Sequence, residues 1–150
     1  MESMEEGDTC EIRPGFVKTL RKKGTGQLPC EGMLCEVHYV GRLDDGSVFD
    51  SSHGRRPLKF HLGMCEVIKG WDMGVSTMTV GERSVLRIPY LYAYGDHGSG
   101  PIPPKADLTF EMELLAARDD TCDSLKRQLG GVAVFVLVVF LLSQYVRPYP

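Results

Sequence analysis

The chain has 150 residues, a charged fraction of 25% and an apolar fraction of 43%, values typical of one soluble globular domain. Its first 128 residues carry 16 basic against 20 acidic side chains, a net charge of −4, which argues against a nucleic-acid-binding surface. The five cysteines contain no C-x-x-C pair and the four histidines have no metal-ligand spacing, so we expect free thiols, no metal and no other cofactor.

The first segment, residues 1–10, is acidic and polar, and we expect a flexible tail there. It lacks the basic and apolar features of a secretory signal peptide or a mitochondrial presequence, so a cytosolic domain is expected. Residues 12–20 predict a first strand that is interrupted by Pro14 and Gly15.

Alternating apolar and polar residues predict the next strands. Residues 33–43 alternate, and Asp45-Gly46 ends that strand in a tight turn from which Val48 and Phe49 return. The same period recurs in three more segments, residues 58–62, 82–89 and 108–114.

One short helix is expected around residues 66–72. Ile68, Trp71 and Val75 lie at i, i+3 and i+7, so one side of it is apolar, and Trp71 is the only tryptophan in the chain. Residues 92–104 form a long loop rich in glycine and proline, and such loops either carry function or are disordered. We therefore predict an α+β fold, an antiparallel half-barrel sheet of about five strands wrapped around the helix.

The C-terminal segment differs from the rest. Residues 129–146 carry no charge, and a helix over them would span roughly 27 Å at about 1.5 Å per residue, near the thickness of a bilayer's hydrocarbon core. A buried core helix is the alternative, but this segment is apolar all round. We expect a transmembrane helix.

The flanks of this segment suggest its orientation. Lys126 and Arg127, in a linker at residues 118–128, place the upstream side in the cytosol, Tyr145 fits an interfacial anchor, and residues 147–150 would be a short lumenal tail. A glycolipid-anchor signal would need an N-terminal signal. We expect a tail anchor, in the endoplasmic reticulum rather than the mitochondrial outer membrane, where more flanking charge is expected.

Several motifs, in their order and spacing, closely resemble the FKBP family of peptidyl-prolyl cis-trans isomerases. The resemblance covers about residues 7–117, and we assign the domain to residues 11–117. The motifs are Val37-His38-Tyr39-Val40-Gly41, Asp45-Gly46, Val48-Phe49-Asp50-Ser51-Ser52, Glu66-Val67-Ile68-Lys69-Gly70-Trp71, Gly81-Glu82, Tyr92-Ala93-Tyr94-Gly95, Ile102-Pro103-Pro104 and residues 110–115.

The resemblance implies rotation of X-Pro amides in protein substrates, without a cofactor, and binding of macrolide inhibitors. The barrier to this rotation is about 18–20 kcal/mol because conjugation must be broken. The twisted amide is less polar than the planar one, so an apolar, water-poor pocket favours the transition state.

The resemblance also implies the site residues. Those with catalytic roles would be Asp50, Tyr94, Trp71 and Phe49, and those that bind substrate would be Tyr39, Phe60, Val67, Ile68, Ile102 and Phe110. The backbone N–H of Ile68, at the start of the helix, is the expected donor to a ligand carbonyl. Without the resemblance, four of the aromatic residues could equally be ordinary core residues: Tyr39, Phe60, Phe110 and Trp71. Asp50 could equally be a turn residue.

Two features depart from the family pattern, and both lie at the rim of the implied pocket. Leu58 stands where an aromatic is common, and the loops at residues 52–57 and 96–103 are each about one residue shorter. Two functions follow from these observations: an isomerase that assists folding at a cytosolic membrane face, or a non-catalytic membrane-tethered adaptor that grips proline loops of a partner. The presence of Asp50, Trp71 and Tyr94 favours the isomerase.

Overall fold

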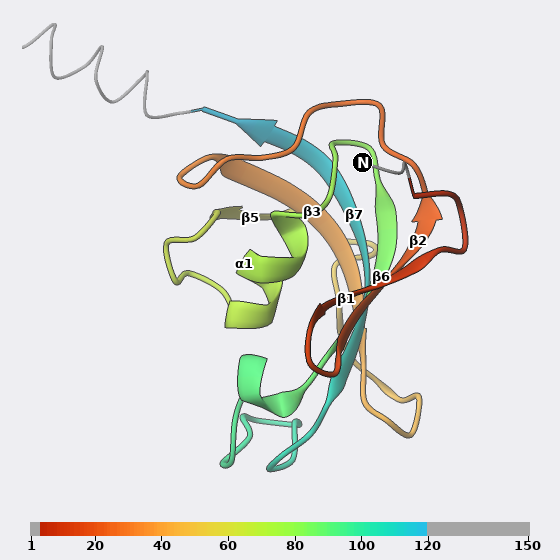
Figure 1. Ribbon diagram of the computed structural model, residues 1–150. Helices are drawn as coiled ribbons and strands as arrows, with labels where there is room; N and C mark the ends of the chain where they lie inside the picture. Colours follow the sequence, from red (N-terminus) through yellow and green to blue (C-terminus); the bar gives the residue numbers. More distant parts are fainter. Residues whose placement is uncertain (1–3, 120–150) are drawn as a thin grey trace, which may run out of the picture. The chain divides into compact units, whose positions relative to one another are not determined.

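A computed structural model of the chain describes residues 4–119 (Figure 1). The transmembrane helix expected at residues 129–146, the tail at 147–150 and nearly all of the linker lie outside this range. Within residues 4–119, no helix has the length and apolar character needed to cross a membrane.

The described residues form seven strands, one α-helix and one short 3₁₀ turn. In chain order these are β1 (Thr9–Arg13), β2 (Phe16–Lys22), β3 (Leu34–Arg42), β4 (Val48–Ser51), β5 (Leu58–His61), α1 (Lys69–Val75), β6 (Arg83–Ile88), η1 (Tyr90–Tyr92) and β7 (Leu108–Arg118).

All strands belong to one antiparallel sheet with the order β1-β2-β6-β7-β3-β4, and β5 pairs with β3 as well. The longest pairing joins β3 to β7, from Leu34 opposite Arg118 to Arg42 opposite Thr109. The sheet curves around α1, which lies against its inner face (Figure 1). The predicted antiparallel sheet around one short helix is thus confirmed, with more strands than expected.

One of the extra strands comes from the first segment, where the sequence predicts a single interrupted strand. The structure instead has a hairpin of β1 and β2 that turns at Pro14 and Gly15. Gly15 has a φ of +76°, which suits glycine, and its N–H donates to Glu11 Oε1 at 2.7 Å. β1 begins at Thr9, inside the segment expected to be a tail, because Thr9 pairs with Thr19 of β2.

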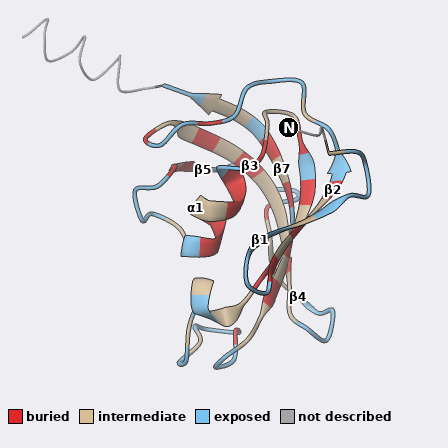
Figure 2. Cartoon of the chain, in the orientation of Figure 1, coloured by how far each residue is buried: buried red, intermediate tan, exposed pale blue. Residues whose placement is uncertain are grey.

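The core lies between the inner face of the sheet and α1 (Figure 2). Trp71 and Val75 of the helix are buried, as are Leu86, Ile88 and the inward residues of β3 and β7. The helix approaches β6 through glycine: a Cβ on Gly70 would lie 2.4 Å from Ile88 Cγ2, and one on Gly74 would lie 2.4 Å from Leu86 Cδ1. These two glycines bring the helix, and with it Trp71, close to the sheet.

Candidate active site

An aromatic cavity of about 170 Å³ opens between α1, the inner face of β3 and β7, and the loops beside them. Eight of the ten predicted site residues line it. The lining consists of Tyr39, Phe49, Asp50, Leu58, Glu66, Val67, Ile68, Trp71, Tyr94 and Phe110.

Trp71 is the centre of the aromatic group. Its ring centroid lies 4.8 Å from that of Tyr39 and 5.2 Å from that of Phe110, in edge-to-face geometries of 71° and 89°. Phe49 packs on Phe110 at 5.6 Å and 86°. Such pairs add about 0.5–1.5 kcal/mol each beyond area burial, so this wall is a rigid, apolar surface.

Gly41 of β3 makes room for this wall. It pairs with Phe110 in the sheet, and a Cβ on it would lie 2.6 Å from Phe49 Cζ and 2.8 Å from Phe110 Cε1. Any larger residue here would displace the two rings from their present contact. The local sequence quoted for the resemblance contains Gly41, but only the packing shows why a glycine is needed.

Asp50 is the charged residue of the cavity, and it is held by three donors. Tyr39 donates its hydroxyl to Asp50 Oδ2 at 2.5 Å, while Arg55 Nη2 and the Ser51 N–H donate to Oδ1 at 2.7 and 2.9 Å. The loop behind it is fixed as well, because Ser52 Oγ, which is buried, accepts the Tyr39 N–H at 2.8 Å. Asp50 therefore has both a turn role and a place in the cavity wall.

These contacts set the protonation states. The hydrogen bond from Tyr39, followed by that from Arg55, lowers the pKa of Asp50. Burial, and then the bond to Asp50, raises the pKa of Tyr39 to about 12, and burial raises the pKa of Tyr94. At neutral pH the cavity holds a carboxylate and two neutral phenols, none of which is suited to exchange a proton with substrate. This arrangement fits an electrostatic role for Asp50.

Two N–H groups of residues that line the cavity have no acceptor among the described residues. Ile68 precedes the first residue of α1, and within residues 4–119 its backbone N–H has no hydrogen-bond partner. The indole Nε1 of Trp71 is buried and likewise has no acceptor among the described residues. A carbonyl group of a bound peptide would satisfy the Ile68 N–H.

Tyr94 lies on the loop between η1 and β7, which is ordered by its own hydrogen bonds. The Gly95 N–H donates to Tyr90 O at 2.9 Å, and the Lys105 N–H donates to Gly95 O at 3.0 Å. Tyr94 is 39% exposed, so a large aromatic side chain stands at the cavity mouth. The long loop thus presents a contact surface for a ligand.

Two predicted site residues lie outside this cavity. Phe60 is 2% exposed and packs behind Trp71, with ring centroids 6.0 Å apart, so in this structure it supports the wall from within the core. Ile102 lines an adjoining cavity of about 240 Å³, which shares Phe49, Asp50 and Tyr94 with the first.

Three contributors to the cavity are not among the residues predicted from the sequence. Leu58 and Glu66 line the cavity, although Leu58 stood out only as a departure from the family pattern. Arg55 binds Asp50, but nothing in the sequence separates it from the neighbouring Arg56. The pairing of Arg55 depends on the turn at residues 51–55, which only the fold supplies.

A larger cavity, of about 410 Å³, lies on the outer face of the sheet. It is lined by charged and imidazole side chains from neighbouring strands and from the loop after β4, among them Arg21, Arg83, Glu113 and the stacked pair His38 and His53. No group of three or more possible metal ligands occurs within residues 4–119. The polar lining of this larger cavity does not suit a reaction that an apolar, water-poor pocket favours.

A comparison with known proteins agrees with the family resemblance that the aromatic cavity supports. Residues 26–115 match the family model described as FKBP-type peptidyl-prolyl cis-trans isomerase. The chain belongs to this family. Relatives with matching domains are named peptidyl-prolyl cis-trans isomerases, which agrees with the isomerase class predicted from the sequence.

Individual FKBP relatives match well. FK506-binding protein 2 of Debaryomyces hansenii is 54% identical over 85 residues, which cover 56% of this chain and 63% of the relative, so the chain spans less than two thirds of that protein. Peptidyl-prolyl cis-trans isomerase FKBP1A of Xenopus laevis is 48% identical over 101 residues, 66% of this chain and 94% of the relative.

A solved structure agrees with the fold. The crystal structure of a peptidyl-prolyl cis-trans isomerase from Pseudomonas syringae pv. tomato aligns with a TM-score of 0.68 and 39% identity, over 77% of this chain and 84% of that one. The FKBP domain of this chain therefore has the family's sheet and helix.

Proposed function

We propose that this chain accelerates cis-trans rotation of X-Pro amide bonds in protein substrates and so assists their folding. The observation that carries the proposal is the aromatic cavity, whose floor is Trp71 and whose wall is Tyr39, Phe49 and Phe110. This surface removes water from the amide, and an amide that loses conjugation loses polarity, so the twisted state is favoured. No proton transfer is required.

The polar groups of the cavity position the peptide. The Ile68 N–H is a donor for a carbonyl beside the proline, and the anionic Asp50 orients Tyr39 and Arg55 at the edge of the cavity. The family membership and the cavity together also support binding of macrolides at the same aromatic surface.

The activity is tested by exchange NMR on a short Leu-Pro peptide with the full chain. Acceleration that is lost on addition of an FK506-type macrolide supports one shared site. Phe49→Ala should reduce the acceleration, while Arg87→Gln, on the outer face of the sheet, should not. A folded chain without acceleration contradicts the proposal and favours the non-catalytic adaptor.

We also propose that residues 129–146 anchor the chain in a membrane with the isomerase domain in the cytosol. The support is the run of 18 uncharged residues and the preceding Lys126 and Arg127. We favour the endoplasmic reticulum over the mitochondrial outer membrane because the flanks carry little charge. Deletion of residues 129–150 should release the protein from membranes washed with alkaline carbonate; unchanged pelleting would contradict the anchor, and microscopy of an N-terminal fluorescent fusion identifies the membrane.

A further inference from the structure

The segment between β5 and α1 supplies one side of the aromatic cavity. Its last three residues, Glu66, Val67 and Ile68, all line the cavity. Ile68 also carries the backbone N–H that has no acceptor among the described residues. The shape of this segment therefore decides where a substrate carbonyl can bind.

The main chain of this segment has few contacts of its own. In the described part of the chain, the main-chain groups of Cys65 and Val67 make no hydrogen bond. Cys65 has a φ of +58°, a left-handed conformation that a residue other than glycine keeps only where its surroundings hold it. The turn before it is fixed at Gly63, whose N–H donates to Asp72 Oδ1 at 2.8 Å. Between that turn and the helix, side-chain contacts must hold the segment.

The Glu66 carboxylate supplies such a contact, because it binds back to the end of β5. Its Oε2 accepts the His61 backbone N–H at 2.8 Å, and its Oε1 lies 2.8 Å from His61 Nδ1. An ionised carboxylate can only accept, so Nδ1 carries the hydrogen of this bond. His61 is itself fixed by the sheet, where it pairs with Leu34 of β3. The contact thus joins the mobile part of the segment to a strand of the sheet.

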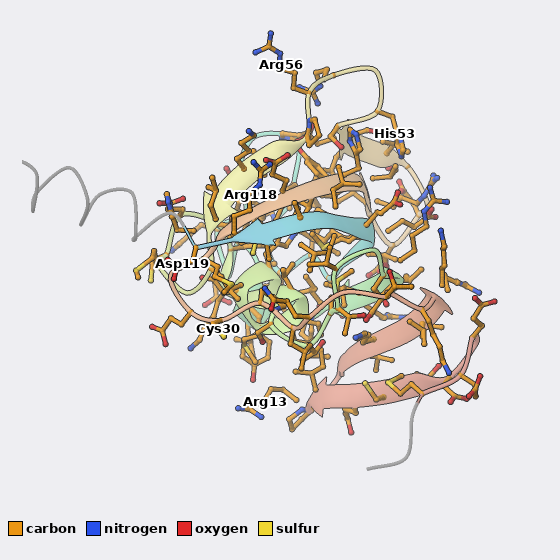
Figure 3. The ribbon with its side chains drawn as sticks, turned by 90° about the horizontal axis from the view of Figure 1, so that it is seen from above. Arg13, Cys30, His53, Arg56, Arg118 and Asp119 are labelled. Carbon is orange, nitrogen blue, oxygen red and sulfur yellow. The ribbon has the colours of Figure 1, made fainter. Side chains whose placement is uncertain are left out.

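The charged groups beside His61 on β5 and β7 bind elsewhere. Lys59 Nζ lies 3.1 Å from Glu36 Oε1, and the guanidinium of Arg118 donates to the same oxygen. Leu34 pairs with both His61 and Arg118, so these groups share one end of the sheet, where Figure 3 shows Arg118 near the end of β7. Lys59 therefore offers a comparison: an ion pair on the same strand that does not reach the cavity segment.

We propose that His61 is a positioning residue for the isomerase site. By binding the Glu66 carboxylate, it holds the segment so that the Ile68 N–H is presented to a substrate carbonyl beside the proline. His61 lines neither cavity of the site, so it acts through Glu66. This inference rests on the proposed isomerase function and adds a residue on which substrate binding depends.

Loss of this contact should weaken substrate binding and leave turnover nearly unchanged. The segment would spend part of its time in forms that do not present the N–H, and the apparent affinity falls with the fraction of competent molecules. The side chains of His61 and Glu66 are 36% and 44% exposed, so we expect KM to rise about two- to fivefold. The kcat should stay the same, because a molecule that has bound substrate has the intact site.

The test measures isomerisation of a Leu-Pro peptide by the full chain, with exchange NMR at a series of peptide concentrations. His61→Leu removes the ring donor and should raise KM, and the Kd from a Trp71 fluorescence titration should rise by the same factor. His61→Asn offers an amide N–H close to the position of Nδ1 and should restore the wild-type KM. Urea unfolding establishes that each variant is folded under the assay conditions.

A double variant shows whether the two residues act through one contact. Glu66→Ala removes both bonds to His61 and should raise KM further. Adding His61→Leu to Glu66→Ala should then have no further effect, since the contact is already lost. Lys59→Leu is the matched control, because it breaks the ion pair with Glu36 on the same strand and should leave KM unchanged.

Several results would overturn the inference alone: an unchanged KM in His61→Leu, an increase that His61→Asn does not reverse, or additive effects of the two variants. If His61→Leu does not fold, Glu66→Gln takes its place, since it keeps the size of the side chain and loses one acceptor; a KM equal to that of wild type would count against the inference in the same way. Absence of acceleration by the wild-type chain would overturn the proposed function, and the inference with it.

Discussion

Tyr39 and Asp50 share a 2.5 Å hydrogen bond, in which the phenol donates to Asp50 Oδ2 at the edge of the aromatic cavity. The two residues come from different strands, β3 and β4, whose pairing places Val40 opposite Ser51 and Gly41 opposite Asp50. The bond keeps the carboxylate charged and the phenol neutral, and it fixes the edge of the wall formed by Tyr39 and Trp71.

The first prediction concerns Tyr39→Phe, which keeps the ring and removes the donor. The pKa of Asp50 should rise toward its ordinary value, because the largest contribution to its lowered pKa is lost. A carboxyl group whose pKa is lower in the folded state stabilises the fold at pH values above its ordinary pKa. This stability is lost as the pH falls through the folded-state pKa. The stability difference between wild type and Tyr39→Phe should therefore shrink toward acid pH.

Urea unfolding over a series of pH values, from neutral downward, measures that difference. Asp50→Asn provides the second comparison, since it removes the titrating group itself and should give a difference with the same pH dependence. A stability difference that stays constant at all pH values would show that the hydrogen bond does not stabilise the charged form of Asp50.

The second prediction concerns the helix contact. Gly70→Ala should destabilise the domain by about 1–3 kcal/mol, because the added Cβ would lie 2.4 Å from Ile88 Cγ2 in a packed core. Helix propensity alone predicts the opposite, a gain of about 1 kcal/mol. The free energy of unfolding in urea decides the sign, with the exposed neighbour Lys69→Ala as the control. A more stable Gly70→Ala variant would contradict the close packing.

The third prediction concerns a buried ion pair that links β2 to the segment leading into β6. Lys18 Nζ lies 2.6 Å from Glu82 Oε1, with side-chain exposures of 3% and 6%, and also donates to Thr77 O at 2.7 Å. Lys18→Met should cost about 3–5 kcal/mol, because it leaves the Glu82 charge buried and unpaired. Adding Glu82→Gln should recover part of this loss.

Thermal or urea unfolding of the two single variants and the double variant gives the coupling energy. The exposed pair of Lys23 and Glu5, 2.8 Å apart, is the comparison, and its removal should cost only about 0–1 kcal/mol. An equal loss in the free energy of unfolding for the buried and the exposed pair would show that burial does not determine the cost of breaking the pair.

Much of the fold is predictable from the sequence because strands and helices repeat their inward-facing positions every few residues. The alternation of Cys35, Val37 and Tyr39 is confirmed in β3, and the apolar side of the helix holds Trp71 and Val75 in the core. These patterns reflect which side chains face inward, and that is determined within a few residues.

The features that the sequence did not reveal depend on contacts between distant segments. The hairpin of β1 and β2 was missed because Pro14-Gly15 reads equally as a break or a turn until the partner strand is known. Gly70 and Gly74 look unfavourable in a helix, and only their approach to β6 explains them. The pairing of Arg55 rather than Arg56 with Asp50 depends on the turn geometry.

The fourth prediction uses Trp71 as a reporter. It is the only tryptophan in the chain and lines the cavity, so its fluorescence should respond when a proline peptide or a macrolide binds. Titration of the full chain should give a saturable change in intensity or wavelength, and Phe49→Ala should weaken it. Binding detected by calorimetry without any fluorescence change would place the ligand elsewhere.

The most direct test of the central claim combines this titration with exchange NMR on the same Leu-Pro peptide. The full chain, present in far smaller amount than the peptide, should accelerate cis-trans exchange in proportion to the Trp71 sites occupied, and a macrolide should abolish both signals. Saturable binding at Trp71 with an unchanged exchange rate would contradict the proposed isomerase activity, because the cavity would then bind proline without favouring the twisted amide.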